Sequence, residues 1–151
     1  MPQRKSGHFL MPRLPDGDAY WGQGAVKLSL SDDGKTLKEF WRNPEVLNNF
    51  GGFVVVDGSI FTTLKGNKLV KLDPDSGTIT DSLKVETGSI IYTDNKFICY
   101  GNKGEVQLAN YENGQLKSGG KFRIKEGKGN HFAHPVVKNG RMYIRRGDAL
   151  M

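Results

Sequence analysis

Val56-Asp57-Gly58-Ser59-Ile60-Phe61 decides the fold of this chain, because the same phrase recurs twice further along. It returns as Tyr92-Thr93-Asp94-Asn95-Lys96-Phe97-Ile98 and as Val137-Lys138-Asn139-Gly140-Arg141-Met142-Tyr143. Each copy has an apolar residue, a polar two-residue turn, and then a run of aromatic and branched residues. Asp-Gly and Asn-Gly tolerate the positive φ that tight hairpin turns require, so each copy predicts a β-hairpin.

The spacing of the copies predicts a repeat architecture. Asp94 follows Asp57 by 37 residues, and Asn139 follows Asp94 by 45 residues. A hairpin unit that recurs at about 40 residues is typical of a propeller blade. The predicted fold is therefore all-β, with about three to three and a half four-stranded antiparallel blades in a partial or open propeller.

The chain divides into an arm and a repeat domain. Residues 1–20 contain three of the six prolines and no clear periodicity, which favours an N-terminal arm or loop. Residues 21–151 form the predicted repeat domain, in which residues 24–30 already alternate between apolar or small and polar side chains, as a half-buried strand does. We expect units at about residues 22–42, 49–85, 88–124 and 132–151, the last breaking off within its third strand.

Composition limits the possible classes of protein. The net charge of +6 permits nucleic acid or acidic glycan as a ligand, but the cations are scattered through the expected strands, as in solvated faces. The single cysteine, Cys99, excludes an intrachain disulfide and a multi-cysteine metal site, and its apolar neighbours predict a buried side chain. The sequence contains neither a stretch of about 18 apolar residues, as a membrane helix needs, nor a secretion signal at its start.

Two segments carry a family resemblance. Residues 68–79 have an apolar strand that ends in Leu-Asp, then a turn and a glycine. This pattern resembles the blade motif of the pyrroloquinoline-quinone-like β-propellers, and residues 131–151 are similar to the final blade of the bacterial members. The resemblance covers about residues 22–151. It implies a propeller fold and a periplasmic or extracellular location.

The resemblance leaves two functions open. The family's quinone-dependent dehydrogenases have rings of about eight blades, and many have an adjacent cysteine pair beside the cofactor. Cys99 has no such neighbour, and no set of acidic or amide residues matches the family's calcium and catalytic positions. We therefore predict a non-catalytic binding or scaffold module, part of a larger propeller protein, with no catalytic, cofactor or metal residues assigned. The alternative is a fragment of a quinone-dependent oxidoreductase, with pyrroloquinoline quinone and calcium as cofactors.

The expected connectivity gathers polar residues on one face. Strand direction alternates within a blade, so the segment before the first strand lies beside the loop between strands two and three. The candidate ligand face of the last unit comprises His131, His134, Arg145, Arg146 and Asp148. Earlier units add Asn48, Asn49, Lys65, Asn67 and Lys103.

Three interpretations of this face compete. Arginine forks could bind an anion or a glycan through paired hydrogen bonds. In the structural alternative, His134 bonds a neighbouring backbone group and Asp148 pairs with an arginine to fix the loop. A metal site formed by His131, His134 and Asp148 is poorly supported, because two histidines three apart in a loop are weak evidence.

The repeat also predicts the kind of partner. Three blades cannot close a ring, since propellers have about 4–8, so the end blades should leave apolar faces and strand edges uncovered. We expect self-association or contact with further blades, and a protein or glycan partner in preference to nucleic acid. Trp21 and Trp41 flank the first hairpin and are interpreted as packing residues between blades.

Overall fold

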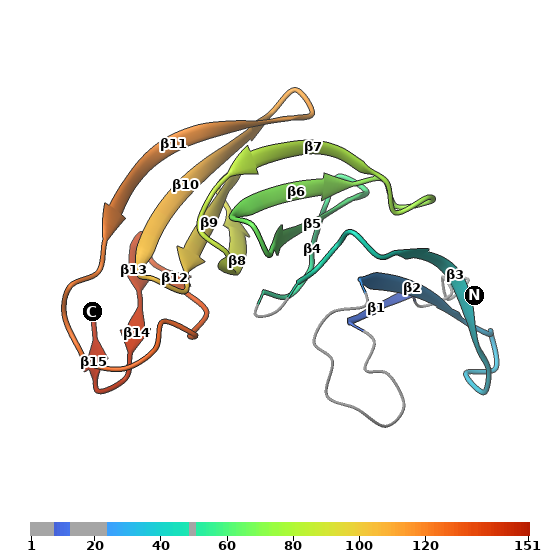
Figure 1. The fold of residues 1–151 in the computed structure, drawn as a ribbon, viewed down its shortest axis with the longest axis horizontal. Coiled ribbons are helices and arrows are strands. Elements are labelled where there is room, and N and C mark those ends of the chain that lie inside the picture. The colour runs from blue at the N-terminus through green and yellow to red at the C-terminus, as the bar shows by residue number, and fades with distance from the viewer. Residues whose placement is uncertain (1–7, 13–23, 49–50) are drawn as a thin grey trace.

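The computed structural model describes residues 8–12, 24–48 and 51–151, which form antiparallel sheets that follow one another along an arc (Figure 1). Unit 1 comprises β1 (His8–Pro12), β2 (Ala25–Leu30) and β3 (Leu37–Asn43). Unit 2 comprises β4 (Val54–Val56), β5 (Ser59–Leu64), β6 (Lys68–Leu72) and β7 (Ile79–Lys84). Unit 3 comprises β8 (Gly88–Thr93), β9 (Lys96–Gly101), β10 (Glu105–Glu112) and β11 (Gln115–Arg123). Unit 4 comprises β12 (Val136–Lys138), β13 (Arg141–Tyr143), β14 (Arg145–Arg146) and β15 (Ala149–Leu150).

Strand order follows chain order in every sheet, which confirms the predicted all-β, propeller-like fold. The outer strands β7 and β11 lie along the convex side of the arc in Figure 1, and β4, β8 and β12 lie toward its concave side. Within the described part of the chain, no helix is long and apolar enough to cross a membrane.

Unit 4 is a three-stranded meander whose middle strand is interrupted at Ile144. β12 pairs with β13, and β14 pairs with β15. Ile144 continues the second pairing, because it exchanges two backbone hydrogen bonds with Met151, at 3.0 and 2.9 Å. β13 and β14 therefore act as one second strand, with the first strand on one side and the third on the other.

The recurring turns have the predicted backbone geometry. The φ angles are 47° and 76° at Asp57 and Gly58, 48° and 58° at Asp94 and Asn95, and 52° and 70° at Asn139 and Gly140. Positive φ at both central residues is the requirement of the type I′ hairpin turn, which matches the twist of the flanking strands. The hairpin prediction is confirmed. Because the turns are equivalent, residue positions in the three units can be compared by counting from them.

Apolar side chains form a layer between each pair of successive units. The layer between units 1 and 2 contains Ala25, Trp41, Val46, Ile60, Leu64, Val70 and Leu72. The layer between units 2 and 3 contains Val56, Phe61, Leu69, Val85, Ile90, Phe97, Cys99, Ala109 and Leu116. The layer between units 3 and 4 contains Ile98, Tyr100, Val106, Ile124 and Ile144. Neighbouring residues such as Phe97 and Ile98 supply different layers, because successive side chains of a strand point to opposite faces.

Counting from the turns aligns the units residue by residue. We call the face of a unit that is turned toward the next unit its forward face. In each of units 2, 3 and 4, the third residue before the turn pairs with the third residue after it. A residue of strand three on the same face, paired two positions further along strand two, completes a forward triplet. The triplets are Val54, Phe61 and Leu69 in unit 2, Ile91, Ile98 and Val106 in unit 3, and Val136, Tyr143 and Leu150 in unit 4. The first triplet packs in the layer toward unit 3, and the second packs in the layer toward unit 4.

A shift of register recurs between the last two strands of units 1, 2 and 3. It places Trp41 and Asp81 at equivalent positions, opposite Lys27 and Lys71. A bulge of this kind strengthens the local twist of the outer strand. Its recurrence shows that unit 1 corresponds to strands two, three and four of a blade.

Trp41 and Asp81 each tie an outer strand to the next unit. Trp41 Nε1 donates a hydrogen bond to Pro74 O at 2.9 Å, and its ring packs on Gly77. The Asp81 carboxylate accepts a hydrogen bond from Leu116 N–H at 2.7 Å. The interpretation of Trp41 as an inter-blade packing residue is confirmed, and Trp21 lies outside the described residues.

Residues 8–12 form a strand within the segment for which the sequence predicted an arm or loop. β1 pairs with β2 along its whole length, from His8 opposite Ser29 to Pro12 opposite Ala25. Phe9, Leu10 and Met11 are consecutive apolar residues, so this segment has no period-2 pattern in its sequence. Pro12 is compatible with a strand here, because β1 is an edge strand and Pro12 is its last residue.

Cys99 is buried in the layer between units 2 and 3, as the sequence predicted. Burial raises the pKa of its thiol to about 12, because the thiolate would lose its hydration there. The thiol therefore stays protonated at neutral pH and serves as a small apolar packing group.

Candidate functional site

In each of units 2, 3 and 4, the loop between strands two and three contacts the segment that leads into the first strand, which we call the lead-in segment. In unit 2, Lys65 N–H donates to Leu47 O at 2.7 Å. In unit 3, Asn102 N–H donates to Thr87 O at 2.9 Å. In unit 4 the direction is reversed, and Lys128 N–H donates to the Asp148 carboxylate at 3.1 Å. The structure thus places lead-in segments and loops side by side, as alternating strands require.

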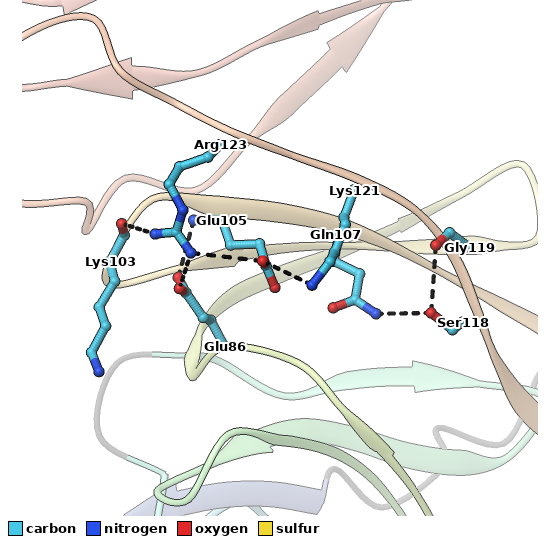
Figure 2. A network of polar contacts seen from close by, with 8 residues as sticks. All are labelled: Glu86, Lys103, Glu105, Gln107, Ser118, Gly119, Lys121 and Arg123. Carbon is cyan, nitrogen blue, oxygen red and sulfur yellow. Dashed lines mark hydrogen bonds and ion pairs between the residues drawn. The ribbon is translucent and has the colours of Figure 1, made fainter.

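Glu86 holds the lead-in segment and the loop of unit 3 together (Figure 2). Its carboxylate accepts hydrogen bonds from Glu105 N–H at 3.0 Å and from Arg123 at 2.8 Å, and Arg123 also donates to Lys103 O at 2.6 Å. Burial raises the pKa of Glu86, but these donors outweigh it and hold the pKa below its ordinary value. Glu86 is therefore charged at neutral pH and braces the Lys103 loop.

His131 is buried and bonded to the preceding unit. Its Nδ1 lies 2.6 Å from the Tyr100 hydroxyl, and the two rings meet edge to face. Gly104 lies directly against the imidazole, since a Cβ at this position would be 2.7 Å from His131 Cε1. Burial lowers the pKa of His131, and the positive charge of Arg146 lowers it further. His131 therefore anchors its lead-in segment as a neutral side chain.

Arg146 and Asp148 fix the lead-in segment of unit 4. Arg146 donates hydrogen bonds to Gly129 O at 3.2 Å, to Lys125 O at 3.2 Å and to Glu126 O at 3.3 Å. The structural alternative paired Asp148 with an arginine; among the described residues no arginine bonds it, and its carboxylate accepts the Lys128 N–H instead. Arg146 and Arg145 bond backbone carbonyl oxygens.

The candidate residues of the earlier units are largely structural as well. Asn48 bonds Gly51, Gly52 and Thr62. Asn67 bonds Thr87 through both its backbone and its side chain. Lys65 and Lys103 have exposed side chains, and Asn49 lies outside the described residues.

Arg145, His134 and Asp148 are the exposed members of the predicted ligand face, and Asp148 is already bonded to Lys128. Within the described ranges, the one hydrogen bond of the Arg145 side chain runs from Nε to Gly147 O at 3.0 Å. It lines a pocket of about 340 Å³ together with Asn130, Phe132, Ala133 and Gly147. The predicted backbone bond of His134 is not found among the described residues. Of the five candidates, Arg145 thus has a guanidinium end available beside a pocket.

The position of Arg145 has a defined role in the other units. Thr63, Tyr100 and Arg145 are equivalent, because each pairs with the third residue of a forward triplet. Thr63 Oγ1 donates to Gly88 O at the start of β8, and Tyr100 bonds His131 in the lead-in segment of unit 4, so both bond the following unit where its first strand begins. Sequence reasoning missed this role, although counting from the turns would have aligned the three positions.

The forward face of unit 4 is uncovered in this structure. Val136 is 56% exposed, Tyr143 is 39% exposed and Leu150 is 72% exposed. The equivalent triplets of units 2 and 3 pack against the following unit. Contiguous apolar side chains on one sheet face are typical of a surface that contacts protein.

Among the described residues, most of the side chains considered for a cofactor or metal are engaged in packing or in other hydrogen bonds. Cys99 packs between units 2 and 3, and Trp41 packs between units 1 and 2, so neither is placed to contact a cofactor. Across the described ranges, no three side chains of His, Cys, Asp or Glu gather as metal ligands would. His131 Nδ1 and the Asp148 carboxylate of the considered metal set bond Tyr100 and Lys128 instead.

We expect the anchoring role of His131 to make stability sensitive to acid. The native state resists protonation of His131, whereas the unfolded chain accepts a proton below about pH 6.5. The stabilisation by His131 is therefore present above about pH 6.5 and is lost as the pH falls toward the lowered native pKa. Urea unfolding of wild type and His131→Gln over this range should show a stability difference that narrows in acid. A difference that is independent of pH would contradict this role.

Comparison with known structures supports the propeller-like arrangement of the sheets. No protein-family model and no curated protein sequence matches the chain. Its structure is similar to that of BamB from Moraxella catarrhalis, with a TM-score of 0.60 and 11% identity over 82% of this chain. This chain spans 43% of the length of that structure. A match to a europium-containing methanol dehydrogenase covers 63% of this chain and 22% of the other, at 16% identity and a TM-score of 0.45, which is too weak to support an inference. The likeness to BamB confirms the predicted propeller fold.

Proposed function

We propose that this chain is a non-catalytic binding or scaffold module. The basis is its fold, which is related to that of the pyrroloquinoline-quinone-like β-propellers. Its contact surface is the forward face of unit 4, and its partner presents a β-blade to that face. No cofactor is part of this proposal. The periplasmic or extracellular location implied by the sequence resemblance stays a prediction.

The exposed forward triplet of unit 4 is the observation that supports this function. Val136, Tyr143 and Leu150 match the unit 2 triplet in chemistry, since both have a valine, an aromatic residue and a leucine. Covering a side chain of this kind stabilises by about 1.5–3 kcal/mol, so an uncovered triplet favours association. Arg145 adds a polar group at the position that bonds the following unit elsewhere in the chain.

When no other protein is present, the partner is a second copy of this chain. The two copies are arranged head to tail, so that the forward face of unit 4 in one copy contacts unit 1 of the other. On β2, Ala25 and Lys27 contact unit 2, so the alternating Leu28 and Leu30 face away from it. Leu37 pairs with Leu30 and is 54% exposed. Both ends of the arc therefore present apolar side chains, and two different surfaces in contact form a heterologous interface.

Sedimentation velocity over a concentration series tests this function. We expect the sedimentation coefficient of wild type to rise with concentration. The double variant Val136→Lys with Tyr143→Lys should remain monomeric, because charged side chains then occupy the forward face. Val55→Lys is the matched control, since Val55 is also an exposed first-strand valine but lies on unit 2. A wild-type protein that is monomeric at every concentration would overturn the proposal.

A further inference from the structure

Unit 2 has two like charges at the place where unit 3 has an ion pair. Lys68 and Lys84 lie directly opposite one another on β6 and β7. Counting from the turns, the equivalent residues of unit 3 are Glu105 and Arg123, which lie opposite one another on β10 and β11. Arg123 lies 3.7 Å from the Glu105 carboxylate (Figure 2). Like charges in directly opposed positions destabilise a sheet, so the lysine pair of unit 2 is unfavourable as it stands.

A third lysine lies at the same end of unit 2. Lys65 precedes Lys68 by three residues, in the loop between strands two and three. We call Lys65, Lys68 and Lys84 the lysine cluster, and all three side chains are exposed. Within the described ranges, no carboxylate forms an ion pair with any of them. Glu86, two residues after Lys84, bonds Arg123 instead, so the repulsion within the cluster is not relieved by the protein.

Exposed lysines continue along the same side of the arc in the next two units. Lys103 lies in the loop of unit 3, and Lys125 and Lys128 lie in the lead-in segment of unit 4. None of the three forms an ion pair in the part of the chain that the structure describes. The carboxylates of Glu126 and Asp148 accept backbone hydrogen bonds in this region. The lysine cluster is therefore the densest part of a row of ammonium groups that follows the units.

The composition of this row favours a ligand that is recognised by its charges. A lysine ammonium is a compact point charge without the planar fork of arginine, so it binds anionic groups with little geometric selection. Residues 64–68, 84–87, 101–104 and 125–129 contain no aromatic residue. Single-stranded nucleic acid gains much of its affinity from stacking on aromatic side chains, which this row does not offer. A polysaccharide with regularly spaced anionic groups needs charge complementarity along its length.

We propose that this row binds an acidic polysaccharide, with the lysine cluster as the principal contact. Sulfate or carboxylate groups on successive sugars accept hydrogen bonds from the ammonium groups. The ligand relieves the repulsion between Lys68 and Lys84, so its binding also stabilises the folded state. Lys65 and Lys103 belong to the predicted ligand face, whereas Lys68 and Lys84 become neighbours only through strand pairing. This site does not include the forward face of unit 4, so neither proposal depends on the other.

Calorimetric titration with heparin, a sulfated polysaccharide, tests the site. We expect wild type to bind heparin with an affinity that falls linearly with salt concentration on logarithmic axes. Lys68→Glu should weaken binding more than about tenfold, because it removes one ammonium and repels the ligand. The same substitution places a carboxylate opposite Lys84, as in the pair of unit 3, and should raise the midpoint of thermal unfolding. Loss of binding by a stabilised variant then comes from the site and not from unfolding.

A matched pair of triple variants separates the site from total charge. One variant replaces all three residues of the lysine cluster by serine. The other combines Lys35→Ser, Lys38→Ser and Lys138→Ser, which removes three exposed lysines at the opposite ends of the strands. The first should lose heparin binding, and the second should bind within about twofold of wild type. Equal losses in both variants, or absence of binding by wild type, would overturn the proposal. Cluster-dependent binding of DNA as tight as that of heparin would overturn the assignment of a polysaccharide.

Discussion

Replacement of Phe61 by alanine is expected to lower the free energy of unfolding by about 3–5 kcal/mol. The Phe61 side chain is fully buried on the forward face of unit 2. Its ring contacts Phe97 at 4.6 Å and Tyr111 at 5.0 Å between centroids, so truncation leaves a cavity and also removes these ring contacts. Guanidinium unfolding of wild type and variant measures the difference.

Val55→Ala is the control for Phe61→Ala. Val55 lies on the paired strand β4 but is 64% exposed, so the change should alter stability by less than about 0.5 kcal/mol. If Phe61→Ala destroys the folded state, Phe61→Leu provides a measurable intermediate. A Phe61→Ala protein as stable as the Val55→Ala protein would show that units 2 and 3 do not pack through this layer.

Trp41→Ala is expected to have a comparable effect, about 3–5 kcal/mol, because the ring fills the layer between units 1 and 2. Trp41→Phe should cost less, since a ring remains and the main loss is the Nε1 hydrogen bond to Pro74 O, about 1 kcal/mol. Chemical unfolding of the two variants separates ring packing from the hydrogen bond.

A pair of glycine substitutions tests the same contact from the other side. Gly77 and Gly58 have similar positive φ angles of 72° and 76°, so alanine is strained at both. A Cβ at Gly77 would lie 2.5 Å from Trp41, whereas a Cβ at Gly58 meets nothing within 4 Å. Gly77→Ala should therefore destabilise the protein more than Gly58→Ala does. Equal effects would mean that Trp41 does not pack on Gly77.

The repeat could be predicted from sequence because its determinants are local. Asp57-Gly58 and its two counterparts specify the hairpin turns by residue chemistry alone, and the branched and aromatic residues around them indicate the strands. β1 could not be predicted, because its strand conformation depends on pairing with β2, which is distant in sequence. The register shifts opposite Lys27 and Lys71 also arise from pairing and leave no local signal.

The lead-in segments and loops of the candidate ligand face lie side by side as predicted, but the contacts of its residues are long-range in sequence. Arg146 bonds the backbone oxygens of Lys125, Glu126 and Gly129, and His131 bonds Tyr100, 31 residues away. The spacing of the charged residues in the sequence predicts neither of these contacts. The forward triplets, in contrast, follow from counting residues away from each turn. Alignment of the three hairpins would therefore have indicated Tyr143 and Arg145 from sequence alone.

The central claim is that the forward face of unit 4 is a contact surface for another blade. Methyl NMR spectra of the chain at increasing concentration test this claim directly. We expect concentration-dependent shifts at the methyl groups of Val136 and Leu150, with those of Val55 unchanged. Spectra in which Val136 and Leu150 stay constant while the protein self-associates through another surface, or does not associate at all, would contradict the claim.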